Sequence, residues 1–337
     1  MQNVNQLYTK CAQNLNQDII SSLTHLYNTT NNEHKLITSR MDVQLAYINQ
    51  YDKQWLDKKV SYFIAATDKK AENFNGILGE IRAYGDLLEL QHNLFSVKKI
   101  KTPSSGSDFV MILDDNTSIH IEVNTPQQSD GKITSTEIEK TTKEIKNYKI
   151  EYDISAHAPY GYPGRKKDNI QYEAVSKFSQ IKNKQEGKQF KKDKISILWL
   201  DLNDPKISMF NQLDYTTPII SFNGAISSGF IWNAFYSLQG DKIYANHDSF
   251  SKDYIEMEFN GRFSNSYIDF VVLDCFTHKV IFENHNSKKE FPSEIYKLFL
   301  NFFNLNNQSS YLSFGNKKLL KDIIKAERTL SNSLVDL

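Results

Sequence analysis

Between residues 95 and 126 the spacing of apolar side chains changes from a helical period to a period of two, and this change most constrains the fold. Three segments show the alternation of strands, namely FSVKKI (95–100), DFVMIL (108–113) and SIHIEV (118–123). The turn sequence DDNT (114–117) joins the last two, so they are predicted to form a β-hairpin. An amphipathic helix, GILGEIRAYGDLLEL (76–90), is predicted before these strands.

Downstream of the hairpin the pattern predicts another helix over 171–192 and a strand over ISILWLDL (195–202), whose continuous apolar run is typical of a strand buried on both faces. The order helix, three strands, helix, strand predicts an α/β fold with an αβββαβ core and a mixed sheet. We assign residues 76–204 to this core. Residues 1–75 are predicted to be a helical N-terminal region, and 205–337 an α+β region for recognition, dimerisation or extension of the core.

Composition excludes several classes of protein. Lys and Arg together number 40, as do Asp and Glu, so a nucleic-acid surface has to arise from local patches of charge rather than from net charge. The two cysteines, Cys11 and Cys275, are far apart in sequence, which disfavours a disulfide framework or a structural zinc site. With no secretory signal pattern and no apolar run of about 18 residues, a cytoplasmic protein without a membrane span is expected.

Asp108 and Glu122 stand at the two open ends of the predicted hairpin. If the hairpin loop has an odd number of residues, Asp108 pairs with residue 122 or 124 and lies on the same face as His120, Glu122 and Asn124. With an even loop it does not, unless a bulge corrects the register or Asp108 lies just off the strand. Carboxylates held close together are stabilised by a cation, and Mg²⁺ prefers such oxygen ligands. The alternative is that Asp108 caps a turn and Glu122 pairs with a surface lysine.

The segments SGSDF and IEVN, separated as they are here, resemble the PD-(D/E)xK nuclease superfamily, which includes many restriction and phage-defence enzymes. The resemblance covers about residues 76 to 202 and implies a restriction-endonuclease-like core. It implies a Mg²⁺-dependent endodeoxyribonuclease in which Mn²⁺ substitutes for Mg²⁺, acting on DNA in bacterial restriction or antiviral defence, as a homodimer or with a partner defence protein. Asp108 and Glu122 match the metal ligands, the carbonyl of Val123 is a third candidate ligand, and Glu80 matches an assisting glutamate.

Two positions depart from that superfamily pattern. Ser107 stands where proline is usual, and Asn124 stands where lysine is expected to position water and offset phosphate charge. Asn124 cannot supply a positive charge or act as a base, so either another residue takes this role or the chain is a catalytically inactive module that binds nucleic acid or protein. In the 171–192 helix, Lys182 and Gln185 lie on the apolar stripe. They are therefore the predicted replacements, unless the end of that helix is solvated.

Basic residues cluster in the same helix and in the loop before it. A phosphate track is predicted from these residues together with KKIK (98–101), and the alternative is a solvated charged surface. The predicted nucleic-acid-binding residues are Lys184, Lys188, Lys191, Arg165 and Lys166.

Overall fold

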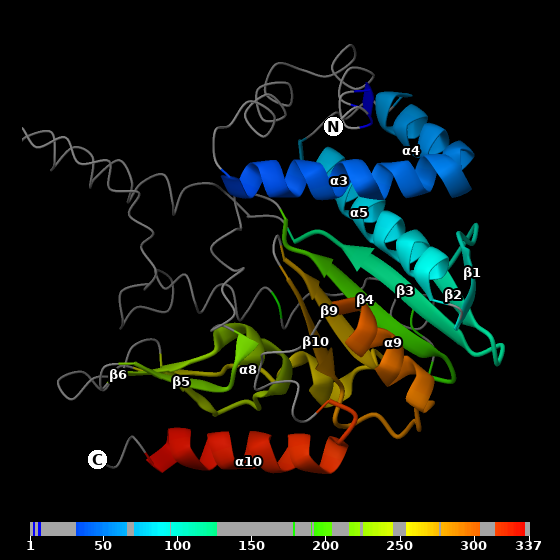
Figure 1. Ribbon diagram of the computed structural model, residues 1–337. Helices are drawn as coiled ribbons and strands as arrows, with labels where there is room; N and C mark the ends of the chain where they lie inside the picture. The colour runs from blue at the N-terminus through cyan, green and yellow to red at the C-terminus, as the bar shows by residue number, and fades with distance from the viewer. Residues whose placement is uncertain are drawn as a thin grey trace, which may run out of the picture. The chain divides into compact units, whose positions relative to one another are not determined.

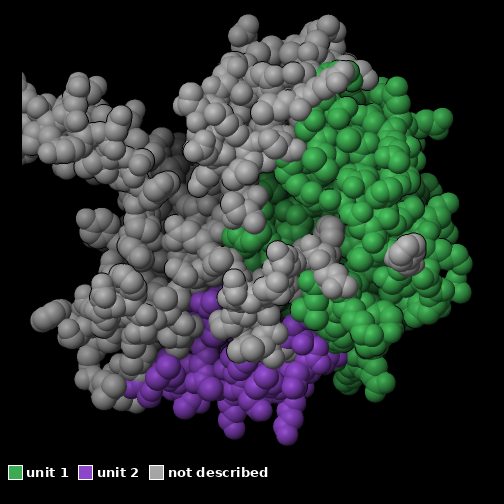
Figure 2. Space-filling model, in the orientation of Figure 1, with its two compact units in different colours: residues 1–127, 183–205, 267–308 green, residues 128–182, 206–266, 309–337 purple. Residues whose placement is uncertain are grey.

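In the computed structural model the chain forms two compact units, which are shown in different colours in Figure 2. Unit 1 comprises residues 1–127, 183–205 and 267–308, and unit 2 comprises 128–182, 206–266 and 309–337. The structure describes residues 3, 6–7, 32–65, 71–94, 96–126, 178, 190, 192–203, 216–222, 225–244, 254–275, 278–303 and 314–333.

A six-stranded mixed sheet is the centre of unit 1 (Figure 1). Its strands, in spatial order, are β1 (Val97–Lys101), β2 (Phe109–Leu113), β3 (Ser118–Asn124), β4 (Ile195–Asp201), β9 (Phe270–Asp274) and β10 (Lys279–Glu283). β1, β2 and β3 are antiparallel, β4 and β9 continue parallel to β3, and β10 returns antiparallel. The α/β class and the mixed sheet are confirmed, and two strands from the 205–337 region extend the sheet.

The β2–β3 hairpin has the odd loop on which the pairing of Asp108 depends. Phe109 pairs with Ile121 and Ile112 with Ser118, which leaves five residues, 113–117, in the loop. Asn116 adopts a positive φ of 63° there, a conformation that asparagine tolerates better than most residues. Continuing the register by one residue places Asp108 opposite Glu122.

Helix α5 (Ala71–Asn93) covers one face of the β1–β3 half of the sheet (Figure 1). The predicted helix 76–90 is confirmed and extends further at both ends. Phe109 and Ile121 are fully buried on this face. Tyr84 of α5 stacks on Phe109 at 4.9 Å between ring centroids, and Trp55 of α4 (Lys53–Ala65) packs edge-on against Tyr84 at 4.6 Å. This aromatic cluster fixes the start of β2, and therefore Asp108, relative to α4 and α5.

Helix α3 (Asn32–Tyr51) crosses α5 at very short range (Figure 1). A Cβ added to Gly85 would lie 2.6 Å from the Cα of Gln44, so only glycine permits this crossing. Helix α9 (Ser293–Phe303) packs on the β9 end of the sheet, where Phe299 meets Phe270 with 5.4 Å between ring centroids. Both ends of this sheet face are therefore covered by helices.

Unit 2 contains two small antiparallel pairs, β5 (Ile219–Phe222) with β6 (Ala225–Ser228) and β7 (Lys242–Tyr244) with β8 (Tyr254–Glu256). Helix α8 (Phe230–Tyr236) is buried along its whole length, and its Phe235 packs on Phe263 of the short helix η3 (Arg262–Asn265). Helix α10 (Lys317–Ser333) buries Leu320 and Ile324, and its Arg328 binds Asp241 at 2.8 Å. This unit therefore has an apolar core of its own.

Several predicted segments lie outside the described residues. They include the loop with Arg165 and Lys166 and nearly all of the helix predicted over 171–192, of which Phe178 and Phe190 are described as buried. The predicted replacements Lys182 and Gln185, and the predicted track residues Lys184, Lys188 and Lys191, also lie outside. Across the described helices, none has the length and apolar character needed to cross a membrane.

Candidate functional site at one end of the sheet

The amino end of β2 and the carboxyl ends of β3 and β4 meet at one end of the sheet, because β2 is antiparallel to β3 and β4 is parallel to it. The amino-terminal half of α5 lies against the same end. A Cβ added to Gly79 of α5 would lie 2.1 Å from Oγ1 of Thr125 and 2.9 Å from Oδ2 of Asp201. Glycine at position 79 therefore lets the α5 backbone approach the carboxyl ends of both strands.

Asp108 is tied to the backbone beside Glu122. Its Oδ2 accepts a hydrogen bond from the backbone N–H of Val123 at 2.9 Å. Burial raises the pKa of Asp108 to about 6, and the charge of Glu80 adds to the increase, while the Val123 bond and Lys59 oppose it. Burial and Glu80 thus disfavour the ionised form of Asp108 in the folded protein. A carboxylate with such a perturbed pKa is a candidate for function rather than a simple turn cap.

Glu80 of α5 forms an ion pair with Lys59 of α4. The Lys59 ammonium also lies 5.6 Å from the ring centroid of Trp55, one helical turn earlier, within the range of a cation–π contact. The field of Lys59 extends to Asp108, whose pKa it lowers. Two carboxylates and one lysine, from α5, from the bend before β2 and from α4, thus influence one another electrostatically.

Glu122 is buried, with 9% of its surface exposed. Alternation along β3 puts it on the same face as Ser118 and His120, opposite to the face that carries Ile119 and Ile121. His120 contacts Ser107 through Nδ1, at 3.2 Å from the serine Oγ. The residue before Asp108 therefore bridges to the strand that carries Glu122.

Asn124 ends β3 opposite Leu200 of β4 and is half-buried. Within the part of the chain that the structure describes, no three His, Cys, Asp or Glu residues gather closely enough to hold a metal ion. Any metal site built from these residues rests on two carboxylates, with water and phosphate oxygens completing the shell. Mg²⁺ accepts such a ligand set.

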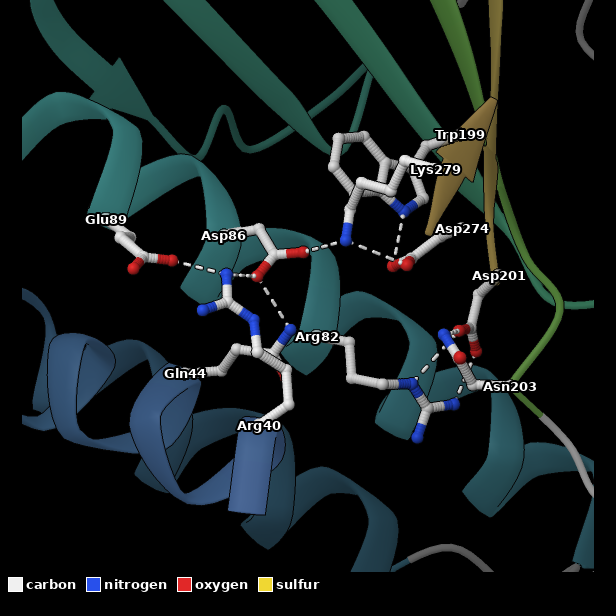
Figure 3. A network of polar contacts seen from close by, with 10 residues as sticks. All are labelled: Arg40, Gln44, Arg82, Asp86, Glu89, Trp199, Asp201, Asn203, Asp274 and Lys279. Atoms are coloured by element: carbon white, nitrogen blue, oxygen red, sulfur yellow. Dashed lines mark hydrogen bonds and ion pairs between the residues drawn. The ribbon is translucent and has the colours of Figure 1, made fainter. Parts of the chain in front are cut away.

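A buried polar network, which the sequence analysis did not identify, continues from this end of the sheet (Figure 3). The guanidinium group of Arg82 on α5 binds the Asp201 carboxylate through two atoms. Its Nε donates a hydrogen bond at 3.0 Å, and its Nη2 contacts the other carboxylate oxygen. Asn203 donates to the same carboxylate at 2.7 Å. Because Asp201 ends β4 and is fully buried, this bidentate pair fixes α5 to the sheet.

Lys279 forms the second part of the network. Its Nζ lies 2.7 Å from Oδ2 of Asp86 on α5 and 2.9 Å from Oδ1 of Asp274 on β9, as Figure 3 shows. Arg40 of α3 binds Asp86 at 2.5 Å, and the indole N–H of Trp199 donates to Asp274 at 3.2 Å. Four elements of unit 1 are thereby joined through charged groups.

The pKa values of this network follow from its charges. Burial alone would raise the pKa of Asp86, but Lys279 and Arg40 outweigh it and hold the pKa below its usual value. Burial raises the pKa of Asp274, and the charges of Asp86 and Asp201 raise it further. Burial would lower the pKa of Lys279, but the two aspartates hold it above its usual value. Lys279 therefore stays charged because both aspartates surround it.

Lys59 and the network were missed because no local pattern marks them. Lys59 lies 21 positions before Glu80, in a region predicted only as helical. One feature of the sequence does point to the network. Asp201 and Asp274 each end an apolar strand, in WLD and VLD, and the ends of neighbouring parallel strands bring such residues together.

Comparisons of the chain with protein-family models, with curated proteins and with solved structures gave no match. The geometry of the chain itself is therefore the ground for a functional proposal.

Proposed function

We propose that this chain is a metal-dependent endonuclease of the PD-(D/E)xK type, which hydrolyses DNA phosphodiester bonds in bacterial restriction or phage defence. The observation that carries the proposal is the position of Asp108. Its carboxylate bonds the amide next to Glu122, and its pKa is raised by Glu80 from the preceding helix. These two contacts support a site that combines the three acids implied by the family resemblance.

The proposed ligands of Mg²⁺ or Mn²⁺ are Asp108 and Glu122, assisted by Glu80. Hard carboxylate oxygens suit these ions, and a cation relieves both the burial of Asp108 and its repulsion by Glu80. When bound, the metal lowers the pKa of a coordinated water and offsets phosphate charge. Asp108 and Glu122 have to be ionised to bind it, so activity is expected to fall as the pH drops below about 6.

Lys59 is our candidate for the positive charge that Asn124 lacks. It reaches Glu80 directly and acts on Asp108 through space, so it orients the acids and faces the phosphate charge. Lys182 and Gln185 remain proposed contributors from the helix predicted over 171–192. The basic residues Lys184, Lys188, Lys191, Arg165 and Lys166 remain proposed DNA contacts.

The test is plasmid cleavage by the purified chain in Mg²⁺, in Mn²⁺ and in EDTA. We expect metal-dependent nicking or cutting, reduced about 100-fold by Glu122→Gln, since losing a metal ligand or its support typically costs this much. Glu290→Gln, at an exposed position, is the matched control and is expected to cut like the wild type. Cutting in EDTA, or full activity of Glu122→Gln, would contradict the proposal.

Replacing Lys59 by methionine is expected to reduce cleavage about 10- to 100-fold, because the charge is lost while the side chain still packs on Trp55. Lys59 lowers the pKa of Asp108, so its loss should also move the acid limb of the pH–rate profile to higher pH. Lys58→Met is the control, since Lys58 lies over Tyr62 instead. An unshifted pH profile would reduce Lys59 to a purely structural contact.

A second candidate function is a binding module without catalysis. Asn124 in place of lysine favours it, as does the lack of a three-ligand metal cluster among the described residues. It predicts that Asp108→Ala leaves function intact and that neither Mg²⁺ nor Mn²⁺ produces cutting.

A further inference from the structure

A groove of about 660 Å³ is lined by β1, by one face of β2 and β3, and by Asp52 and Lys194. The strand register shows how it is built. Lys101 pairs with Val110, which pairs with His120, and Lys99 pairs with Ile112, which pairs with Ser118. Directly paired residues share a face of the sheet. The two rows therefore form the floor and one wall of the groove, and each row consists of a lysine from β1, an aliphatic residue from β2 and a polar residue from β3.

The groove is predominantly basic. Lys194, just before β4, adds a third ammonium group on the side opposite to β1, and one acid, Asp52, is among the residues lining it. Asp52 accepts hydrogen bonds from the hydroxyl of Tyr84 at 2.8 Å and from the amide of Trp55 at 3.2 Å. The chain as a whole is neutral, so three lysines around one concavity are a local concentration of positive charge.

The floor of the groove leads toward the proposed metal ligands. Ser118, His120 and Glu122 follow one another at every second position of β3, on the same face. An extended polyanion lying between β1 and Lys194 would run along β3 toward Glu122. Half-buried Val110 and Ile112 offer an apolar surface to sugars or bases between the lysines.

We propose that this groove binds the phosphodiester backbone of DNA, with Lys99, Lys101 and Lys194 as phosphate contacts, and feeds it to the acids at the end of β3. The inference rests on the proposed endonuclease function and deepens it. It also replaces the general basic track predicted from KKIK (98–101) with particular members of that segment: Lys99 and Lys101 line the groove. Lys98 instead donates to Asn116 in the hairpin turn at 3.2 Å.

That difference supplies a matched control within one strand. The binding of a fluorescent 20-nucleotide single strand, and of its duplex, is measured by anisotropy with the full chain in EDTA at several salt concentrations. Lys99→Glu and Lys101→Glu are each expected to weaken binding about 5- to 10-fold. Each should also reduce the slope of log K against log salt by about 0.7 for the single strand and 0.9 for the duplex. Lys98→Glu is expected to stay within twofold of the wild type with an unchanged slope.

Equal weakening by all three variants would show a non-specific charge effect and overturn the groove. Unchanged binding by Lys99→Glu and Lys101→Glu would also overturn it, as would a wild-type chain that binds neither probe. All three lysines are exposed, so equal urea midpoints are expected and verify folding. Plasmid cleavage in parallel separates the two proposals. If both groove variants still cut the plasmid, only the proposal that the groove feeds DNA to the site is contradicted. If binding depends on the groove lysines but the wild type does not cut, only the proposed endonuclease activity is contradicted.

Discussion

Replacing Lys279 by methionine is expected to lower the free energy of unfolding by about 3–5 kcal/mol, the usual cost of removing one partner from a buried ion pair. Methionine fills a similar volume but leaves Asp86 and Asp274 facing each other without the ammonium group between them. Asp86 keeps its ion pair with Arg40, whereas Asp274 keeps the neutral indole N–H of Trp199 as a donor. Urea unfolding, followed by circular dichroism, measures the change.

The control for Lys279→Met is Lys288→Met, at an exposed position five residues before α9 begins, and it is expected to change stability by less than about 0.5 kcal/mol. A triple variant with Asp86→Asn and Asp274→Asn added to Lys279→Met tests the reason. Removing all three charges should recover part of the loss, because neutral groups do not carry the cost of an uncompensated buried charge. If Lys279→Met alone were as stable as the wild type, the network would not hold the sheet to α5.

The network explains how the candidate site keeps its shape. Arg82 and Asp86 are four residues apart on α5, and each binds an acid or base from a different strand of the sheet. Glu80 lies two residues before Arg82 on α5, so anchoring Arg82 to Asp201 fixes the position from which Glu80 acts on Asp108. Helix α5 therefore serves both stability and the proposed chemistry. Its buried Arg82 and Asp86 hold the helix to the sheet, and its Glu80 acts on Asp108.

Much of the central fold follows from local patterns. The alternation in DFVMIL and SIHIEV determines the strands, and the five-residue loop determines which residues pair. A one-residue change of register would expose Ile119 and Ile121, so the hydrophobic pattern strongly selects the register that places Asp108 opposite Glu122. The continuous apolar run of ISILWLDL likewise predicts β4, because a strand between two others is buried on both faces.

Other features depend on contacts between distant segments. The strand pattern of FVVLD is visible, but its pairing beside β4 joins residues about 70 positions apart, and no local sequence signal specifies that neighbour. Lys59 resembles any exposed helical lysine until α4 is packed against α5. Gly85 is unremarkable inside a helical pattern, and its purpose appears only when Gln44 of α3 is seen against it. Tertiary packing, rather than propensity, decides each of these cases.

Replacing Asp108 by asparagine is expected to have two opposite effects, a loss of cleavage of about a thousandfold and a gain in stability at pH 7. The loss follows from removing a carboxylate that the metal requires, whose contribution is several kcal/mol. The gain follows from the pKa, which folding raises from 3.8 to about 6. Each pKa unit corresponds to about 1.4 kcal/mol, so the expected gain is about 1–3 kcal/mol. Asparagine keeps an oxygen that can accept from the Val123 amide.

The sign of the pH dependence gives a sharper test of the same variant. The folded protein holds a proton on Asp108 more tightly than the unfolded chain does, so this group reduces stability as the pH rises from about 4 to about 6. The wild type should therefore lose stability relative to Asp108→Asn across that window, and the difference should level off above it. Asp114→Asn, in the exposed hairpin turn, is the control and should run parallel to the wild type. Mg²⁺ should raise the melting temperature of the wild type but not of Asp108→Asn. A variant less stable than the wild type at pH 7 would mean that the Asp108 charge stabilises the fold, which would make it a structural cap.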